Sequence, residues 1–339
     1  MKPFYCKLIL ILLALVVSTS CGSGTSETSS HSDKPASVVT ESQSVTAFPV
    51  VIKDDRGLEV SIPQKPLRIV SLLPSHTEIL YAVGAGKQLV GCTTFCNYPA
   101  ETKQLEKVAL SNPGSVSLET LVALEPDLVF LGGDYQRLLA EQLTKLKIPL
   151  LSFESQSVAD IERSIRGISR STGHAQVGEE LIEKIKKEIA AIQKRVEPFQ
   201  KQRRPRVFYQ VWDQPLMTAG PTSFIGELID LIGAENVFED VKIAYPQVSE
   251  ETLIVRNPDV ILMPLTKKAG ASDLSETISE LRERPGWKKM SAVKNQRIYL
   301  IEDDLISRPG PRVVLGLQKI AQALYPEAYQ PHSSSERTQ

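Results

Sequence analysis

The stretch that decides the fold is Val116-Ser117-Leu118-Glu119-Thr120-Leu121, continued by Pro126-Asp127-Leu128-Val129-Phe130-Leu131, because the chain contains this pattern twice. The second copy is Val248-Ser249-Glu250-Glu251-Thr252-Leu253, continued by Pro258-Asp259-Val260-Ile261-Leu262-Met263. Seven positions are identical, with the same spacing and no gap. Two copies so far apart in the chain predict two lobes built on one plan.

Each copy predicts a short helix followed by a buried strand. Ser117 and Ser249 can cap a helix whose first turn holds Glu119 or Glu251, where a carboxylate suits the unpaired N–H groups. The Pro-Asp pair ends the helix, and the apolar run after it suits an inner strand of a parallel sheet. Two interpretations of the glutamates stay open: one carboxylate presented at the same place on each lobe, or ordinary first-turn charges.

Elsewhere the chain alternates strand and helix, which predicts an α/β fold with mainly parallel sheets. A hairpin is expected over 49–62, then strands over 68–72, 89–93, 148–153, 206–211 and 297–301, and helices over 75–83, 158–171, 223–232 and up to about 324. Ser75, with Glu78 three residues later, predicts a capped start for the first of these helices. In such folds ligands bind beyond the carboxyl ends of the strands.

One long amphipathic helix lies between the two copies. Its apolar positions recur at threes and fours: Val177, Leu181, Ile182, Ile185, Ile189, Ile192 and Val196. We expect this helix to join the lobes and to end at Pro198. The predicted organisation is a signal peptide (1–20), a tether (21–47), an N-terminal lobe (48–173), the linking helix (174–200), a C-terminal lobe (201–326) and a disordered tail (327–339).

The N-terminus has the pattern of a bacterial lipoprotein signal. Lys2 and Lys7 precede an apolar run over 8–17, and Cys21 follows as the residue that would be lipidated. Ser18 stands where such signals usually have Leu or Val, so a plain secretory signal stays open. The Ser- and Thr-rich residues 22–47 predict a flexible tether outside the cytoplasm.

Composition and motifs disfavour several classes of function. A net charge of −1 gives no support for binding to nucleic acid. Gly84-Ala85-Gly86-Lys87-Gln88 lacks the spacing of a phosphate loop, and the chain has no G-x-S-x-G or H-E-x-x-H motif. We therefore expect no catalytic residues and no cofactor.

Two cysteines remain in the part of the chain expected to fold, Cys92 and Cys96. They could pair in an oxidising compartment, or they could be two small buried thiols. An enzyme using both as metal ligands would need further ligands such as His76.

Large rings in loops offer a different kind of site. Phe95, Tyr98, Trp212 and Tyr245 all lie in predicted loops. Aromatic faces with a few polar groups suit a bulky, partly planar ligand, although a ring in a loop can also close the edge of a domain.

The chain resembles the vitamin B12-binding proteins of bacterial ABC importers, in order and over about residues 68–324. The resemblance rests on the segments 68–80, 90–99, 117–129, 218–220, 233–238, 245–249 and 308–312. It implies a class III periplasmic binding protein, in which one long, rigid helix bridges two α/β lobes and the ligand lies between them. The wider superfamily also binds ferric siderophores and haem.

The resemblance also implies roles for particular residues. Glu119 and Glu251 match glutamates that dock onto the permease dimer, which works with its ATPase subunits. The expected ligand contacts are Pro74, Ser75, Phe95, Trp212, Tyr245, Asp304, Leu305, Ile306, Ser307 and Arg308. The metal of such a ligand is already chelated, so we expect no bond from the protein to a metal, packing for Cys96 and helix-start hydrogen bonding for His76.

This sequence departs from that family at two places. Residues 304–308 lack the aromatic pair of some members, and 109–115 lack an aromatic residue. A siderophore, haem or another corrinoid therefore remains an alternative to cobalamin.

Overall fold

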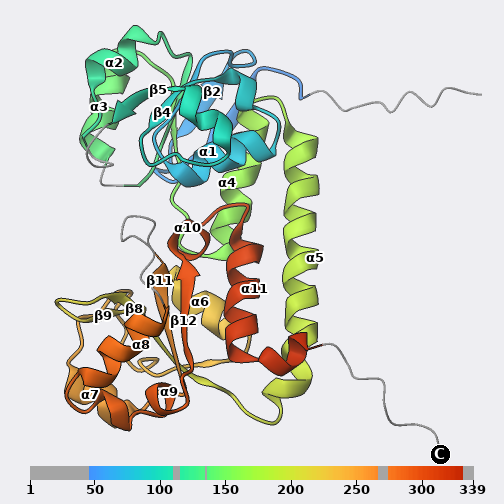
Figure 1. Ribbon diagram of the computed structural model, residues 1–339. Helices are drawn as coiled ribbons and strands as arrows, with labels where there is room; N and C mark the ends of the chain where they lie inside the picture. The colour runs from blue at the N-terminus through green and yellow to red at the C-terminus, as the bar shows by residue number, and fades with distance from the viewer. Residues whose placement is uncertain (1–45, 110–114, 134–135, 266–273, 331–339) are drawn as a thin grey trace, which may run out of the picture. The chain divides into compact units, whose positions relative to one another are not determined.

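The computed structural model describes residues 46–109, 115–133, 136–265 and 274–330 (Figure 1). The chain divides into two units, 1–42 and 43–339, and all described residues belong to the second. The predicted signal peptide, Cys21 and nearly all of the tether lie outside the described residues. Among the described helices, none is both long enough and apolar enough to cross a lipid bilayer.

The N-terminal lobe is built on a parallel five-stranded sheet with the order β5-β4-β3-β6-β7. Its strands are β3 (Ile69–Ser71), β4 (Leu89–Thr93), β5 (Glu106–Ala109), β6 (Leu128–Leu131) and β7 (Leu150–Ser152). The helical elements are α1 (Pro74–Ala82), η1 (Gly86–Gln88), η2 (Ala100–Gln104), α2 (Leu118–Ala123), α3 (Arg137–Lys145) and α4 (Val158–Ser171). The predicted hairpin is present as β1 (Val50–Lys53) and β2 (Glu59–Ile62).

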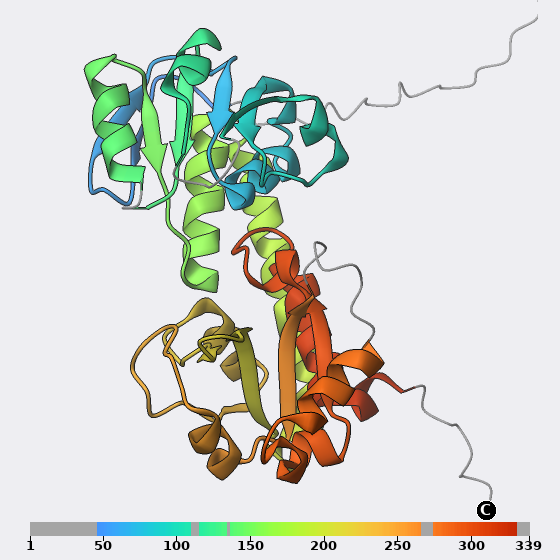
Figure 2. The ribbon, with the colours of Figure 1, turned by 60° about the vertical axis from the view of Figure 1, so that its left-hand side comes forward.

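The C-terminal lobe repeats this plan with a second sheet (Figure 2). Its strands follow the order β10-β8-β11-β12. Its strands are β8 (Arg206–Trp212), β10 (Glu235–Asn236), β11 (Val260–Leu265) and β12 (Ile298–Glu302), with β9 (Met217–Thr218) antiparallel to β8. The helical elements are α6 (Phe224–Leu231), α7 (Glu250–Arg256), α8 (Leu274–Glu283), η4 (Trp287–Lys289), α9 (Ser291–Lys294), α10 (Asp303–Ile306) and α11 (Val313–Leu324). The mixed α/β fold with two parallel sheets is as predicted.

The repeated stretch occupies equivalent places in the two lobes. It forms α2 and β6 in one lobe and α7 and β11 in the other. Strand β6 lies beside β3, just as β11 lies beside β8. The predicted caps are confirmed, because Ser117 and Ser249 each accept a hydrogen bond from the backbone N–H three residues later.

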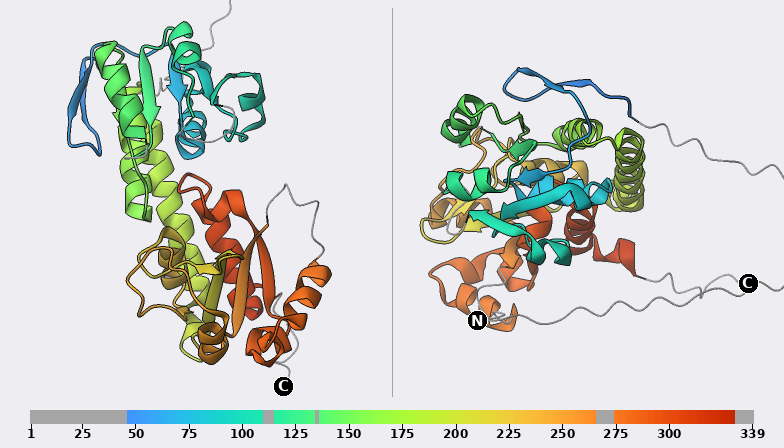
Figure 3. Two further views of the ribbon diagram at one scale, coloured as in Figure 1. Left: turned by 90° about the vertical axis from the view of Figure 1, so that its left-hand side faces the viewer. Right: turned by 90° about the horizontal axis from the view of Figure 1, so that it is seen from above.

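The linking helix is α5 (Ala175–Gln200), which packs against α4 of the first lobe and α11 of the second (Figure 3). Its 26 residues correspond to about 39 Å of helix. The buried face contains Ile182, Ile185, Ile189, Ile192 and Val196, as the periodicity predicts.

Three details differ from the sequence predictions. Pro198 lies inside the last turn of α5 and does not end the helix, which continues to Gln200. The disordered tail was predicted to begin at residue 327, but Pro326–Tyr329 forms a helical turn. The Tyr329 ring also lies 5.0 Å from the guanidinium of Arg195. Ser75 does not cap α1: Leu73 is the N-cap and Pro74, which has no N–H to satisfy, takes the first turn.

A cleft lined by both lobes

A cavity of about 770 Å³ is lined by residues of both lobes. The N-terminal lobe contributes Glu154, Ser155 and Gln156, which follow β7. The C-terminal lobe contributes residues from β8, β9, β11 and α10, from the start of α6, and from the loop between β10 and α7: Tyr209, Val211, Met217, Thr222, Ser223, Phe224, Ile225, Ala244, Tyr245, Pro264, Asp303, Ile306, Ser307 and Pro309.

A second cavity of about 490 Å³ adjoins the first. Its N-terminal wall consists of Leu73, Pro74, Ser75, Thr93, Phe95 and Gly132, and Arg308 lines the other side. Glu154, Ser155, Ser307 and Pro309 line both cavities. A typical small-molecule pocket has a volume of about 300–1,000 Å³. The two adjoining cavities together therefore have room for a ligand that is larger than a typical drug molecule.

Sheet topology explains why these residues meet. Strands β3, β4, β6 and β7 run parallel, so the segments after them emerge at one edge of the sheet. Pro74, Phe95, Gly132 and Glu154 each lie just beyond the carboxyl end of one of these strands. The cleft is therefore assembled from the places where an α/β sheet presents its ligand sites.

The polar groups of the larger cavity are mainly neutral or acidic. Burial raises the pKa of Tyr209, and the nearby charge of Asp303 raises it further. Burial also raises the pKa of Tyr245. Both phenols therefore keep their protons at neutral pH and can donate hydrogen bonds to a ligand.

Positive charge in the cleft is limited and already paired. Glu154 and Asp303 are the acidic residues among the lining residues, and Arg308 is the basic one. The Arg308 guanidinium lies 2.7 Å from the carboxylate of Asp304. The described cleft therefore offers no unpaired cation to an anionic ligand.

Seven of the ten predicted ligand contacts line these cavities. They are Pro74, Ser75, Phe95, Tyr245, Ile306, Ser307 and Arg308. Trp212, Asp304 and Leu305 line neither cavity. The Trp212 ring is 62% exposed and donates to the Gln214 carbonyl at 3.0 Å, whereas the Leu305 side chain is buried.

The sequence prediction missed other lining residues. Glu154, Ser155 and Gln156 directly follow the predicted strand 148–153, so the rule for strand ends could have identified them. Tyr209 gave no such signal, because it lies within β8 and resembles any other core residue of a strand.

His76 and the two cysteines lie outside the cleft lining. His76 is 1% exposed, its Nδ1 has no hydrogen-bond partner, and its ring packs against Phe130 and Phe153. The imidazole instead forms a hydrogen bond with the backbone of Phe153, which follows β7, so the expected hydrogen bonding at the helix start was wrong. Burial lowers the pKa of His76 to about 4.

Cys92 and Cys96 are both free and buried. The Cys92 sulfur accepts a hydrogen bond from Lys107 Nζ at 3.1 Å, and the Cys96 sulfur accepts one from Thr77 Oγ1 at 3.1 Å. Within the described residues, no group of three or more His, Cys, Asp or Glu side chains is placed to hold a metal ion.

Comparisons with known proteins agree with this architecture. Residues 69–305 match the periplasmic binding protein family. An uncharacterized ABC transporter substrate-binding lipoprotein of Bacillus subtilis is 32% identical over 94% of this chain and 96% of its own length. A vitamin B12-binding protein of Pectobacterium carotovorum is 33% identical over 80% of this chain and 92% of its own length.

A solved structure shares both fold and sequence. The structure of a possible iron-binding, periplasmic solute-binding protein from Staphylococcus epidermidis is 31% identical, with a TM-score of 0.67, and covers 77% of this chain and 100% of its own. These relatives are named as binding and transport proteins. By its sequence, its two-lobed fold and its cleft, the chain belongs to the periplasmic binding protein family, as a substrate-binding protein of the ABC transporter type.

Proposed function

We propose that this protein captures a corrinoid, with cobalamin as the principal candidate, in the cleft between its lobes and delivers it to an ABC permease. The observation that carries the proposal is the pair of adjoining cavities, which are large and whose described lining residues offer no unpaired positive charge. The vitamin B12-binding relative supports the same ligand class.

The chemistry of the lining suits a corrin ring. Such a ring is broad and partly planar, and it carries amide groups around its edge. Phe95 and Tyr245 supply aromatic surface for the ring, while Glu154 and Asp303 supply acceptors for amide N–H groups. The cobalt stays within the corrin chelate, so the protein contributes no metal ligand, no cofactor and no catalytic residue.

Delivery would use the two glutamates of the repeat. Glu119 and Glu251 are exposed on equivalent helices of the two lobes. A permease dimer has two equivalent docking sites, and two equivalent carboxylates would match them. We propose that the partner is such a dimer with its ATPase subunits.

We also propose that a lipid on Cys21 anchors the protein to the outer face of the cell membrane or in the periplasm. The naming of the B. subtilis relative as a lipoprotein supports this anchor. Residues 22–47 would then act as the tether between the lipid and the folded lobes.

Isothermal titration of the chain from Gln43 onward with cyanocobalamin tests the ligand assignment. We expect one-to-one binding, with haem and a ferric siderophore giving much weaker heats. Failure of cyanocobalamin to bind, with the lobes folded by circular dichroism, would contradict the proposal.

A ferric siderophore or haem is the second candidate, because the similar S. epidermidis structure is described as possibly iron-binding. Siderophores and haem usually carry carboxylates or catecholates, which favour unpaired Arg or Lys side chains. Among the described residues that line the two cavities, Arg308 is the basic one, and it already pairs with Asp304. The charge of the cleft therefore favours the corrinoid.

A further inference from the structure

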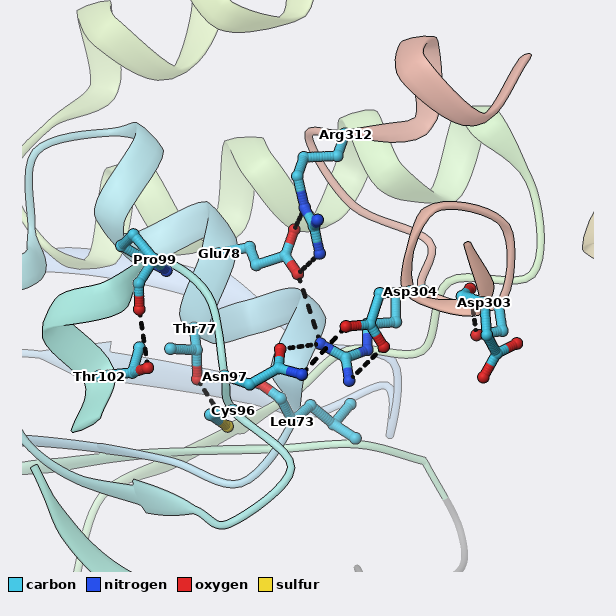
Figure 4. Close-up of polar contacts among 12 residues, drawn as sticks. Leu73, Thr77, Glu78, Cys96, Asn97, Pro99, Thr102, Asp303, Asp304 and Arg312 are labelled. Carbon is cyan, nitrogen blue, oxygen red and sulfur yellow. Dashed lines mark hydrogen bonds and ion pairs between the residues drawn. The ribbon is translucent and has the colours of Figure 1, made fainter. Parts of the chain in front are cut away.

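A polar network joins the two lobes at the edge of the smaller cavity (Figure 4). Its centre is an ion pair between Arg312, the N-cap of α11, and Glu78 in α1. Arg312 donates from Nε to Oε2 at 2.8 Å and from Nη2 to Oε1 at 2.6 Å. The two side chains are 16% and 3% exposed, so this bidentate pair is largely shielded from water.

A second group of contacts lies beside the first. Arg308 pairs with Asp304 at 2.7 Å and donates to Asn97 Oδ1 at 2.7 Å. Asn97 Nδ2 donates to Asp304 Oδ2 at 3.0 Å. Both ends of the Asn97 amide are thus satisfied by one ion pair from the other lobe. Arg308 also lies 3.8 Å from Glu78, which connects the two groups.

The segments that carry this network also line the cleft. On the N-terminal lobe, α1 contributes Ser75 to the smaller cavity and the loop after β4 contributes Phe95. On the C-terminal lobe, Arg308 belongs to the network and also lines the smaller cavity, and its neighbour Ser307 lines the same cavity. Separating the lobes would therefore break these bonds and open the smaller cavity in one movement.

The energetics favour a reversible closure. A shielded ion pair gains Coulomb energy but loses hydration, so the intact pair contributes little net free energy. Removing one partner has a larger effect, because the other charge is left without compensation while the lobes are closed. Water can solvate that charge once the lobes separate, so removing one partner destabilises the closed arrangement relative to the open one.

We propose that Glu78, Asn97, Asp304, Arg308 and Arg312 form a latch that sets the closed arrangement of the lobes and opens for ligand exchange. This rests on the proposed function only in taking the cleft as the ligand site. Two of these residues, Asp304 and Arg308, were expected from the sequence to contact the ligand. Here they bond across the cleft to the other lobe.

The distance between the lobes in the full-length chain tests the latch without any ligand. Spin labels on Leu138→Cys and Val255→Cys, which are 69% and 84% exposed in different lobes, report that distance by double electron–electron resonance. Cys6 and Cys21 are replaced by serine, and Cys92 and Cys96 are buried away from the label. The variants are Glu78→Gln, Arg312→Gln, and the two together.

Each single variant should move molecules to longer distances, and the double variant should return most of them to the parent distribution. The matched control is Glu179→Gln, which breaks a bidentate pair with Arg166 between α4 and α5 and leaves the latch intact. We expect that control to match the parent. Single variants that fold but keep the parent distribution would overturn the latch, as would a double variant that stays open.

Asn97→Ala is the safeguard if the buried variants do not fold, because Asn97 is exposed in a loop. It should shift the distances in the same direction, and an unchanged distribution would overturn the latch.

A second readout is the release of cyanocobalamin, which should be roughly tenfold faster or more in Arg312→Gln. If the parent protein does not bind cyanocobalamin, the proposed ligand is wrong. The spin-label distances between the lobes still test the latch in that case, because they are measured without a ligand.

Discussion

Glu119 and Glu251 occupy the same position in two helices that begin in the same way, one in each lobe. Ser117 Oγ accepts from the Thr120 N–H at 3.2 Å, and Ser249 Oγ accepts from the Thr252 N–H at 3.1 Å. Both carboxylates are exposed, and within the described residues neither forms an ion pair with another side chain. The two charges are therefore available to a partner.

Reversing both charges should separate transport from binding. In Glu119→Arg/Glu251→Arg, uptake of labelled cyanocobalamin by cells should fall at least tenfold, because two docking contacts become repulsive. The affinity of the purified protein should stay within twofold of the parent, since neither residue lines the cleft. The measurements are cellular uptake and isothermal titration.

The control for this variant is Glu188→Arg, which reverses an exposed charge on α5. It should transport like the parent. An equal loss of ligand affinity and uptake in the double variant would show that Glu119 and Glu251 act on the cleft and not on docking.

Removing rings from the cleft should weaken binding according to position. Tyr245→Ala and Phe95→Ala should each lower the affinity for cyanocobalamin about 10- to 100-fold, because both side chains line a cavity. Trp212→Ala should change it less than threefold, since this ring lies outside both cavities. Titration of the three variants checks the ranking, and a dominant effect of Trp212 would contradict the assigned cleft.

The repeat explains why so much of the fold could be predicted. Serine caps and apolar runs depend on residues that are close in sequence, and both copies form the predicted helix and strand. The long helix followed in the same way from its apolar periodicity. These features arise from local geometry and from burial of one face.

Contacts between distant residues could not be predicted in this way. The capping pattern placed Glu78 at a helix start, but its carboxylate binds Arg312, 234 residues later. Asp304 likewise has its partner Asn97 on the other lobe. Trp212 was expected to reach the ligand, although the turn to Gln214 directs its ring N–H back to the backbone. Such pairings depend on how the lobes come together.

The repeated aspartates should contribute similar stability to the two lobes. Asp127 accepts from the Leu67 and Arg68 N–H groups at 2.7 and 3.0 Å, and Asp259 accepts from the Arg206 N–H at 3.1 Å. Replacing either by alanine leaves backbone donors at the start of a strand without that acceptor. We expect losses of about 1–3 kcal/mol in the free energy of unfolding.

Urea unfolding measures these losses, and asparagine is the matched substitution. Because the Asn side chain keeps one oxygen acceptor, Asp127→Asn and Asp259→Asn should lose less stability than the alanine variants. Asp230→Ala, at an exposed position of α6, should be nearly neutral. Equal losses at Asp127 and Asp230 would argue against a role for the Asp127 bonds.

His76 should make the stability depend on pH. Burial lowers its pKa from 6.5 to about 4 in the folded chain. Between these two values the unfolded chain binds a proton that the folded chain does not, so the free energy of unfolding falls as the pH falls. This stability is fully present above pH 6.5 and is lost as the pH falls, and the loss reaches about 3 kcal/mol at pH 4, at about 1.4 kcal/mol for each pKa unit.

The variant His76→Phe should remove this part of the pH dependence, because a phenyl ring fills the site beside Phe130 and Phe153 without binding a proton. Urea unfolding of both proteins at pH 7, 5.5 and 4.5 gives the comparison. Carboxylates titrate in both proteins, so the difference between them isolates the imidazole. The parent should lose more stability than the variant at each step, and parallel losses would show that the buried His76 does not control acid stability.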